Sequence, residues 1–257
     1  MTAEFDFPHL HRDSQKGEQI HALIQAPAHA GSQFDLRCGI FLDNSRRGFP
    51  LIEMASNQIS RMKQKFVLAL SSFVLVVCLS GCCRPEIIGS VPNTLKPQET
   101  NNWCWAATTQ MLAEHLGLSI TQCALANHRF NKTNCCDEQT SGTPCPKTND
   151  CNTPGWVDLD FAGAKSSESG SALSWDSVKS QIYCTKKPMG YAYGTPGVVG
   201  HVVVIKGYVS VGNISYVVLN DPWNPCQGAE RLLEYSSYAD PPGTATHWNT
   251  WYDIAKK

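Results

Sequence analysis

The chain has 257 residues, of which 17% are charged, and its formal net charge at pH 7 is −1. This balance lacks the strong basic character of a nucleic-acid-binding protein, so no nucleic-acid partner is expected. Residues 1–61 are polar and mixed and show no sustained hydrophobic periodicity, which predicts solvated loop. The histidines of this segment have spacings that fit no metal-ligand pattern, so we predict no metal site among them: His9, His11, His21 and His29.

An export signal follows at residues 62–81. Met62 to Lys65 is basic, and Phe66 to Leu79 is an apolar run that is shorter than the about 20 residues of a membrane-spanning helix. The run ends in Leu79-Ser80-Gly81-Cys82, which resembles the lipobox of bacterial lipoprotein signal peptides. The resemblance implies cleavage before Cys82 and acylation of that cysteine, which anchors a protein to a membrane. An uncleaved anchor or a plain signal peptide is the alternative.

A signal peptide in this position makes Met62 the expected start, with residues 1–61 an upstream over-call or a disordered extension. Cleavage before Cys82 leaves a chain long enough for one domain with a hydrophobic core. Residues 82–97 are interpreted as a proline-containing tether, and residues 98–257 as the domain. We therefore expect an exported monomer, held by acylated Cys82 on the periplasmic or cell-surface side of a membrane.

The stretch from Gln98 to Gly117 predicts the first helix of the domain. Asn101 and Asn102 offer capping side chains, and Gly117 is a typical helix stop. Cys104 would lie in the first turn, where free backbone N–H groups and the helix dipole favour a negative charge. The alternative is that Cys104 is one half of a disulfide. The apolar positions of the predicted helix recur at spacings of three and four: Trp105, Ala106, Thr109, Leu112, Ala113 and Leu116.

Gln98 precedes Cys104 by six residues, so its carboxamide and the Cys104 N–H could together stabilise an oxyanion. A glutamine, five residues and then Cys-Trp at the start of a buried helix resembles the active-site start of the papain-like cysteine proteases. The form Asn-Trp-Cys-Trp-Ala-Ala over residues 102–107 is similar to that of the bacterial avirulence-type papain-like proteases. The bacteriocin-processing peptidases are more distantly similar in layout.

Thr121 to Phe130 predicts a second helix, capped by Thr121. The loop after it is poor in apolar residues, so disulfides are expected to brace it. Apart from Cys82 and Cys104, the mature part holds eight cysteines, too many for their spacing to choose a pairing. Cys83 could stay unpaired close to the membrane, and a zinc site is an alternative that no Cys-x-x-Cys pair supports. The remaining seven are expected to be structural: Cys123, Cys135, Cys136, Cys145, Cys151, Cys184 and Cys226.

The second half of the domain begins with a segment rich in Gly and Ser at 157–172, which is expected to be a loop. Ser174 to Ile182 predicts a short amphipathic helix with Ser174 as its cap. Residues 200–208, 216–223 and 246–251 predict strands.

A hairpin is expected between the first two of these strands, because Gly212 and Asn213 are a turn signal. If Tyr208 pairs with residue 214, His201 and Asp221 lie directly opposite each other. A carboxylate at that place would hold the imidazole so that its other ring nitrogen points at the thiol. A slip by one residue would turn the two side chains to opposite faces of the sheet.

Other residues compete for these roles. His115 lies about 16 Å along the predicted helix from Cys104 and cannot reach back. His128 and His247 have the contexts of ordinary surface or core histidines, which leaves His201 as the candidate base. Asn220 competes with its neighbour for the orienting role, and Asp221-Pro222 can also be a simple strand-ending turn.

The order Gln98, Cys104, His201 and Asp221, with Trp223 two residues further on, resembles the order of the papain-like family. The resemblance implies an α+β fold with a helical half, an antiparallel β half and a cleft between them. It also implies a cysteine endopeptidase that acts on a peptide or protein and needs no cofactor or metal.

Departures from the plant and lysosomal enzymes point to the compact bacterial branch. The Cys-to-His separation is shorter, Asn-Asn-Trp replaces Cys-Gly-Ser before the nucleophile, and Asp stands where those enzymes have Asn. Two alternatives remain. One is transglutaminase-like or amidase acyl transfer by the same triad, and the other is a non-catalytic surface module braced by disulfides.

Overall fold

The computed structural model describes residues 83–136, 151–198 and 200–257. The predicted extension, the export signal, the lipidation site Cys82 and the cysteine Cys145 lie outside these residues. No helix in the described part is long and apolar enough to cross a membrane.

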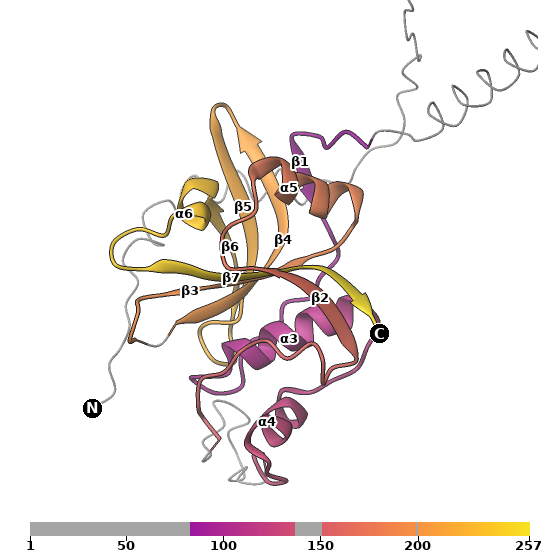
Figure 1. Ribbon diagram of the computed structural model, residues 1–257, viewed down its shortest axis with the longest axis vertical. Helices are drawn as coiled ribbons and strands as arrows, with labels where there is room; N and C mark the ends of the chain where they lie inside the picture. The colour runs from indigo at the N-terminus through magenta and orange to yellow at the C-terminus, as the bar shows by residue number, and fades with distance from the viewer. Residues whose placement is uncertain (1–82, 137–150, 199) are drawn as a thin grey trace, which may run out of the picture. The chain divides into compact units, whose positions relative to one another are not determined.

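The described chain forms a seven-stranded antiparallel sheet with helices on both faces (Figure 1). The strand order is β2-β7-β3-β4-β5-β6, and β1 pairs with β4. The strands are β1 (Ile88–Ser90), β2 (Ala164–Ser169), β3 (Met189–Gly194), β4 (His201–Val211), β5 (Ile214–Asp221), β6 (Ala229–Glu234) and β7 (Thr246–Lys256). The helices are α3 (Cys104–His115), α4 (Gln122–Phe130), α5 (Trp175–Lys179), its π-helical continuation η1 (Ser180–Cys184), and α6 (Tyr235–Ala239). The α+β arrangement that the resemblance to papain-like proteases implies, a helical half and an antiparallel β half, is confirmed.

Helix α3 begins and ends for different reasons. At its end, Gly117 adopts the left-handed region (φ +68°) and the Leu118 N–H donates to the Ala113 carbonyl at 3.0 Å, which is a glycine-based C-cap. At its start, the N-cap residue is Trp103 and no side chain caps the helix. The predicted asparagine cap is wrong, because Asn102 instead donates its side-chain amide to the carbonyl of residue 152.

The central strand β4 is buried on both faces, and its successive residues alternate between two cores. Val202 and Val204 pack with α3 and α4, whereas Val203 and Ile205 pack with α5, η1 and α6. An unbroken apolar run is the pattern expected of a strand covered on both sides. In Figure 1, α3 and α4 accordingly lie on one side of the sheet, and α5 and α6 on the other.

The β4–β5 hairpin closes in a register that differs from the predicted one. Tyr208 pairs with Val217 instead of Ile214, and the turn consists of Gly212 and Asn213 alone. Gly212 has φ +60°, which a two-residue hairpin turn needs and which glycine adopts without strain.

The register differs from the predicted one by an odd number of residues, and a β-bulge compensates for this shift. The register changes between Ile205 and Gly207, so Lys206 is an extra residue on β4. Without the bulge, the shift would turn Asp221 to the face opposite His201. With it, the two side chains share one face of the sheet, placed diagonally and not directly opposite as predicted.

Two other expectations about the chain are wrong. The segment expected to be loop at 157–172 contains the edge strand β2, which pairs with β7. Half of its residues are exposed and only Ala164 is buried, so it lacks the apolar alternation of a half-buried strand. Within the segment interpreted as a tether, residues 88–90 form β1 on the sheet.

Cys83, which was expected to be able to stay unpaired, is bonded to Cys184, because β1 runs beside η1. Disulfides also brace the segment after α4, as predicted. The cysteines of the zinc alternative are therefore consumed in disulfides, and disulfides of this number indicate an exported protein. The described bridges are Cys83–Cys184, Cys123–Cys136 and Cys135–Cys151, and Cys226 is also disulfide-bonded.

Candidate active site

Cys104 is the first residue of α3, and it is only 8% exposed. It carries a free thiol, whereas every other cysteine in the part of the chain that the structure describes is disulfide-bonded. The alternative that Cys104 is one half of a disulfide is therefore wrong. The first turn of α3 has no acidic residue and no side-chain cap. The helix dipole and the backbone N–H groups there favour a negative charge on the sulfur.

The start of α3 is fixed from two sides. The indole N–H of Trp103 donates to the carbonyl of Cys151 at 2.8 Å, inside the segment braced by disulfides. One turn into the helix, the hydroxyl of Thr108 donates to the carbonyl of Val202 on β4 at 3.1 Å. Since β4 begins one residue earlier, the second bond fixes α3 against the strand that carries His201.

His201 is the first residue of β4 and has 9% exposure. Its Nε2 lies 2.6 Å from Oδ1 of Asp221, and its side chain lies close enough to Cys104 for the thiol to affect its pKa. Because Nε2 faces the carboxylate, the contact with the sulfur falls to Nδ1. Tyr193 pairs with His201 across β3 and β4, and its ring meets the imidazole edge-on at 5.9 Å.

The electrostatic environment favours the imidazolium form of His201. Burial lowers the pKa of His201, but the charge and hydrogen bond of Asp221 and the hydrogen bond with Cys104 outweigh it. Together these groups raise the pKa to about 10.

Asp221 ends β5 and is 4% exposed. Its Oδ1 accepts from His201 and from the Trp223 backbone N–H at 2.9 Å, and its Oδ2 accepts from Nε of Arg231 at 2.8 Å. Burial raises the pKa of Asp221, but His201, the Trp223 N–H and Arg231 together lower it below its ordinary value. The carboxylate is therefore held in the ionised form with a donor on each side.

Gln98 is fully buried beside the segment that follows Asp221. Its backbone N–H donates to the Pro222 carbonyl at 3.1 Å, and its carbonyl accepts from the Cys226 N–H at 2.9 Å. The side-chain Nε2 donates to the Thr100 carbonyl at 2.7 Å, and Oε1 has no hydrogen-bond partner among the described residues. A carboxamide nitrogen has two hydrogens, so one donor remains beyond the bond to Thr100.

The geometry thus brings a free thiol, an imidazole and a carboxylate together. A model of the Peptidase_C39 like family matches residues 91–249, which include all three groups. The chain belongs to this family. It is a cysteine peptidase.

Solved structures resemble the peptidase at low sequence identity. A structure from work on the mite allergens Blo t 1 and Der p 1 is 14% identical over 67% of this chain and 72% of that one (TM-score 0.43). Digestive procathepsin L 3 from the larval midgut of Tenebrio molitor is 13% identical over 67% and 71% (TM-score 0.42). Procathepsin L2 from the same tissue is 12% identical over 67% and 70% (TM-score 0.40). No curated protein matches the chain.

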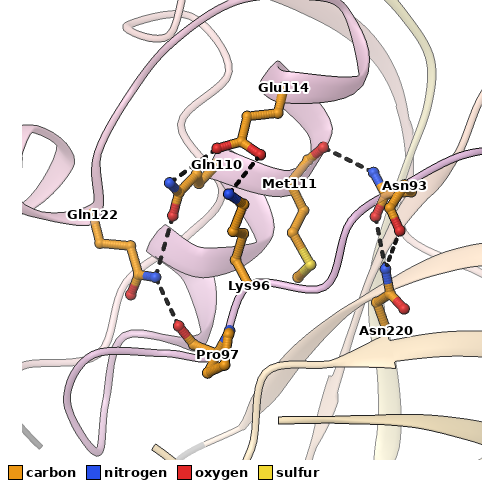
Figure 2. A network of polar contacts seen from close by, with 8 residues as sticks. All are labelled: Asn93, Lys96, Pro97, Gln110, Met111, Glu114, Gln122 and Asn220. Carbon is orange, nitrogen blue, oxygen red and sulfur yellow. Dashed lines mark hydrogen bonds and ion pairs between the residues drawn. The ribbon is translucent and has the colours of Figure 1, made fainter. Parts of the chain in front are cut away.

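Asn220, which the sequence offered as an alternative to Asp221 for orienting His201, points away from the His201 imidazole. Figure 2 shows its amide directed at Asn93, and Nδ2 donates to the Asn93 carbonyl at 2.8 Å and to Oδ1 at 3.0 Å. Asn93 in turn donates to the Met111 carbonyl of α3 at 2.8 Å. Asn220 therefore ties the chain before the active site to α3 and has no part in orienting His201.

The remaining histidines in the described part of the peptidase are bonded elsewhere. His115 lies between the carbonyls of residues 92 and 186. His128 stacks on Phe161 and contacts the carboxylate of residue 158. His247 bonds the carbonyl of residue 238 and the hydroxyl of residue 250.

Arg231 is the functional candidate that sequence reasoning missed. It lies on β6, where it pairs with Leu219 two residues before Asp221, so the guanidinium and the carboxylate share a face. A single arginine in a short strand of mixed polarity carries no motif. The signal exists only once β6 is known to pair with β5.

Proposed function

We propose that the protein is a cysteine endopeptidase that hydrolyses peptide bonds in peptide or protein substrates, with Cys104 as nucleophile. The observation that carries the proposal is the buried His201–Asp221 hydrogen bond of 2.6 Å, with the free thiol of Cys104 close enough to His201 to influence its pKa. A thiol, a base and an orienting group in hydrogen-bond reach are the requirements of nucleophilic acyl transfer.

In the first half of the reaction, His201 already holds the thiol proton as imidazolium, and the Cys104 thiolate attacks the substrate carbonyl carbon. A carbon–sulfur bond forms, and the carbonyl electrons move to oxygen. The Cys104 backbone N–H and the free hydrogen of the Gln98 carboxamide donate to this oxyanion. When the carbonyl re-forms, the carbon–nitrogen bond breaks, and the imidazolium gives its proton to the leaving amine.

In the second half, water attacks the thioester that remains on Cys104. His201 removes a proton from the water as a general base and returns it to the sulfur as the carbon–sulfur bond breaks. The product is a carboxylic acid, and the free thiol is restored. None of these steps requires a cofactor or metal.

Asp221 acts as the orienting group and stabilises the imidazolium, whereas Arg231 is a positioning residue that acts through Asp221. The carboxylate fixes Nε2 of His201, and this leaves Nδ1 for proton exchange with the sulfur. Arg231 holds the second carboxylate oxygen, so the carboxylate plane cannot rotate away from the imidazole without losing an ion pair.

We place the protein in the avirulence-type branch of papain-like proteases, on the Asn-Trp-Cys-Trp-Ala-Ala motif and on the use of Asp221 instead of asparagine. We also retain the lipoprotein proposal, in which residues 62–81 are removed and acylated Cys82 anchors a monomeric 98–257 domain. The disulfides support export, and the anchor is tested by mass spectrometry of the mature N-terminus in wild type and Cys82→Ala.

A peptidyl chloromethyl ketone, which alkylates an activated thiol, tests the proposed nucleophile. Mass mapping of the oxidised protein should place the label on Cys104. The label should be absent from Cys104→Ala and form much more slowly in His201→Ala, while His115→Ala serves as the matched histidine control. A label that persists in Cys104→Ala overturns the assignment.

The same site could transfer the acyl group to an amine instead of water. Supplying a primary amine with a peptide substrate separates the two outcomes. Free acid as the main product supports the endopeptidase, and amide as the main product supports the transglutaminase-like alternative.

A further inference from the structure

A hollow of about 300 Å³ is lined by three tryptophans and a carboxylate, and the reaction described above does not use it. Its lining residues come from the chain before β2, from β2 itself and from β7. They are Trp156, Val157, Glu168, Trp248, Asn249 and Trp251.

The three indoles meet at tilted angles instead of stacking flat, and Trp251 is less exposed than the other two. Trp156 lies 5.9 Å from Trp248 and 5.9 Å from Trp251, at interplanar angles of 54° and 55°. Trp156 is 46% exposed, an unusual position for so large an apolar side chain. The Trp248 indole N–H donates to the hydroxyl of residue 246 at 3.0 Å, so its polar edge is already engaged.

A bulge in β7 places Trp248 in this position. Ala192 pairs with Asn249 and Tyr193 with His247, so Trp248 is the extra residue. Its indole then packs on Gly200, where any side chain would collide with the ring.

Two chain segments link the hollow to the catalytic pair: the Trp248 wall packs on a neighbour of His201, and the segment that carries Trp156 packs on a neighbour of Cys104. Gly200, under Trp248, immediately precedes His201. On the other wall, the residue before Trp156 is Gly155, where an added Cβ would lie 2.7 Å from the Trp105 ring, directly after Cys104. These links bring the hollow within reach of a side chain of a peptide that spans the catalytic pair.

The polar part of the lining favours a cation. Glu168 accepts from the Asn249 amide at 3.0 Å, which fixes one carboxylate oxygen and leaves acceptor capacity for another donor. Tryptophan faces attract ammonium and guanidinium groups, and more strongly when the cation is partly desolvated. A neutral side chain would fill the apolar volume but would gain no attraction from the exposed Glu168 carboxylate.

We propose that Trp156, Trp248, Trp251 and Glu168 form a specificity subsite that takes a lysine or arginine side chain of the substrate. This inference rests on the proposed function, since it supposes that a peptide lies across Cys104. It adds a preference for basic residues to an otherwise general peptidase reaction.

Binding to the catalytically inactive full chain tests the subsite without requiring turnover. Fluorescein-labelled alanine hexapeptides, each with one lysine, norleucine or glutamate at a successive position, are titrated into oxidised Cys104→Ala and followed by fluorescence anisotropy. At one position, lysine should bind about tenfold more tightly than norleucine, and glutamate more weakly than both.

Two further substitutions in the Cys104→Ala background assign that preference to the hollow. Glu168→Gln should reduce the lysine-over-norleucine ratio about fivefold, and Trp156→Leu should reduce it by a similar factor. Asp240→Asn, which removes an exposed carboxylate elsewhere, should leave it unchanged. Unchanged circular dichroism and thermal midpoints show that the variants fold.

Equal affinity for lysine and norleucine at every position overturns the subsite, as does a preference that survives both substitutions. The chloromethyl ketone experiment is independent of this result. If Cys104 fails to react while the lysine preference persists, the proposed hydrolytic reaction is contradicted and the proposed cation-binding subsite is supported.

Discussion

The two faces of β5 at its end use buried polar groups in opposite ways. On one face, Asp221 contacts an imidazole and a guanidinium, and all three groups are ionisable. On the other face, its neighbour Asn220 contacts Asn93 through neutral amides and a backbone carbonyl. The first network can exchange protons with a substrate, whereas the second can only hold segments together.

Two consecutive residues of one strand can therefore have different roles, with Asp221 in the candidate active site and Asn220 in a structural contact. Successive side chains point to opposite faces, so the Asp-Asn pair serves two layers without competing for partners. Changes on the Asp221 face should therefore alter rate and pH dependence, and changes on the Asn220 face should alter stability.

The largest effect is expected when the base is removed. His201→Ala should lower kcat/KM for a peptide substrate by about 10³-fold or more, because the thiol loses its proton acceptor and the leaving amine its donor. Steady-state hydrolysis measures the loss. A reduction below about tenfold would contradict the role of His201, provided that the variant folds, and His247→Ala is the matched histidine control.

The next effect concerns the carboxylate and the pH profile. In the native site the pKa of His201 is raised to about 10, so the imidazolium partner of the thiolate persists until the pH approaches that value. Activity should therefore fall only as the pH rises through about 10. Asp221→Asn removes the charge that raises this pKa, so the alkaline limb should move to lower pH and kcat/KM should drop about 10- to 100-fold.

The same shift has a consequence for stability. Because the folded pKa of His201 lies above its unfolded value of 6.5, its contribution to stability is complete below about pH 6.5 and is lost as the pH rises through about 10. The lowered pKa of Asp221 has the opposite sign, since its contribution is lost as the pH falls through its folded value. If the activity of Asp221→Asn falls at the same alkaline pH as that of wild type, Asp221 does not control the pKa of the His201 imidazole.

A smaller effect is expected at Arg231. Arg231→Gln removes the ion pair on Oδ2 of Asp221 but leaves the contact with His201, so kcat should fall about tenfold while KM changes little. Arg231→Lys keeps the charge without the planar donor and should restore part of the rate. A loss confined to thermal stability, with kcat intact, would make Arg231 a structural residue only.

Much of this arrangement is visible in the sequence, and the remainder depends on contacts between distant segments. Helix α3 and its glycine stop follow from local periodicity and cap chemistry, and the His201 strand follows from its apolar run. The pairing at the far ends of β4 and β5 does not, because the bulge at Lys206 that shifts it by one residue leaves no mark on the pattern of apolar residues. Strand β2 was missed because an exposed edge strand need not alternate.

The residues that contact the active site and the pairing of the cysteines could be identified only from the fold. Arg231 has no motif, and its pairing with Asp221 depends on the β5–β6 register. The Cys83–Cys184 bridge depends on β1 returning to the sheet, which a segment taken as a tether gave no reason to expect. Local chemistry thus singled out the candidate residues, and the contacts that hold them depend on tertiary pairing.

The smallest effect on activity is expected on the opposite face of β5. Asn220→Ala leaves the Asn93 carbonyl and Oδ1 without their donor in a buried place, which should lower the free energy of unfolding by about 1–3 kcal/mol. Urea unfolding of the oxidised protein measures this change, and kcat/KM in the native range should stay within about twofold of wild type. Asn249, which is only partly buried and whose amide bonds the exposed carboxylate of Glu168, provides the control, since Asn249→Ala should change stability far less. A large loss of kcat/KM in folded Asn220→Ala would mean that the two faces of β5 are coupled, because the neutral network would then be setting the position of Asp221 through the backbone that they share.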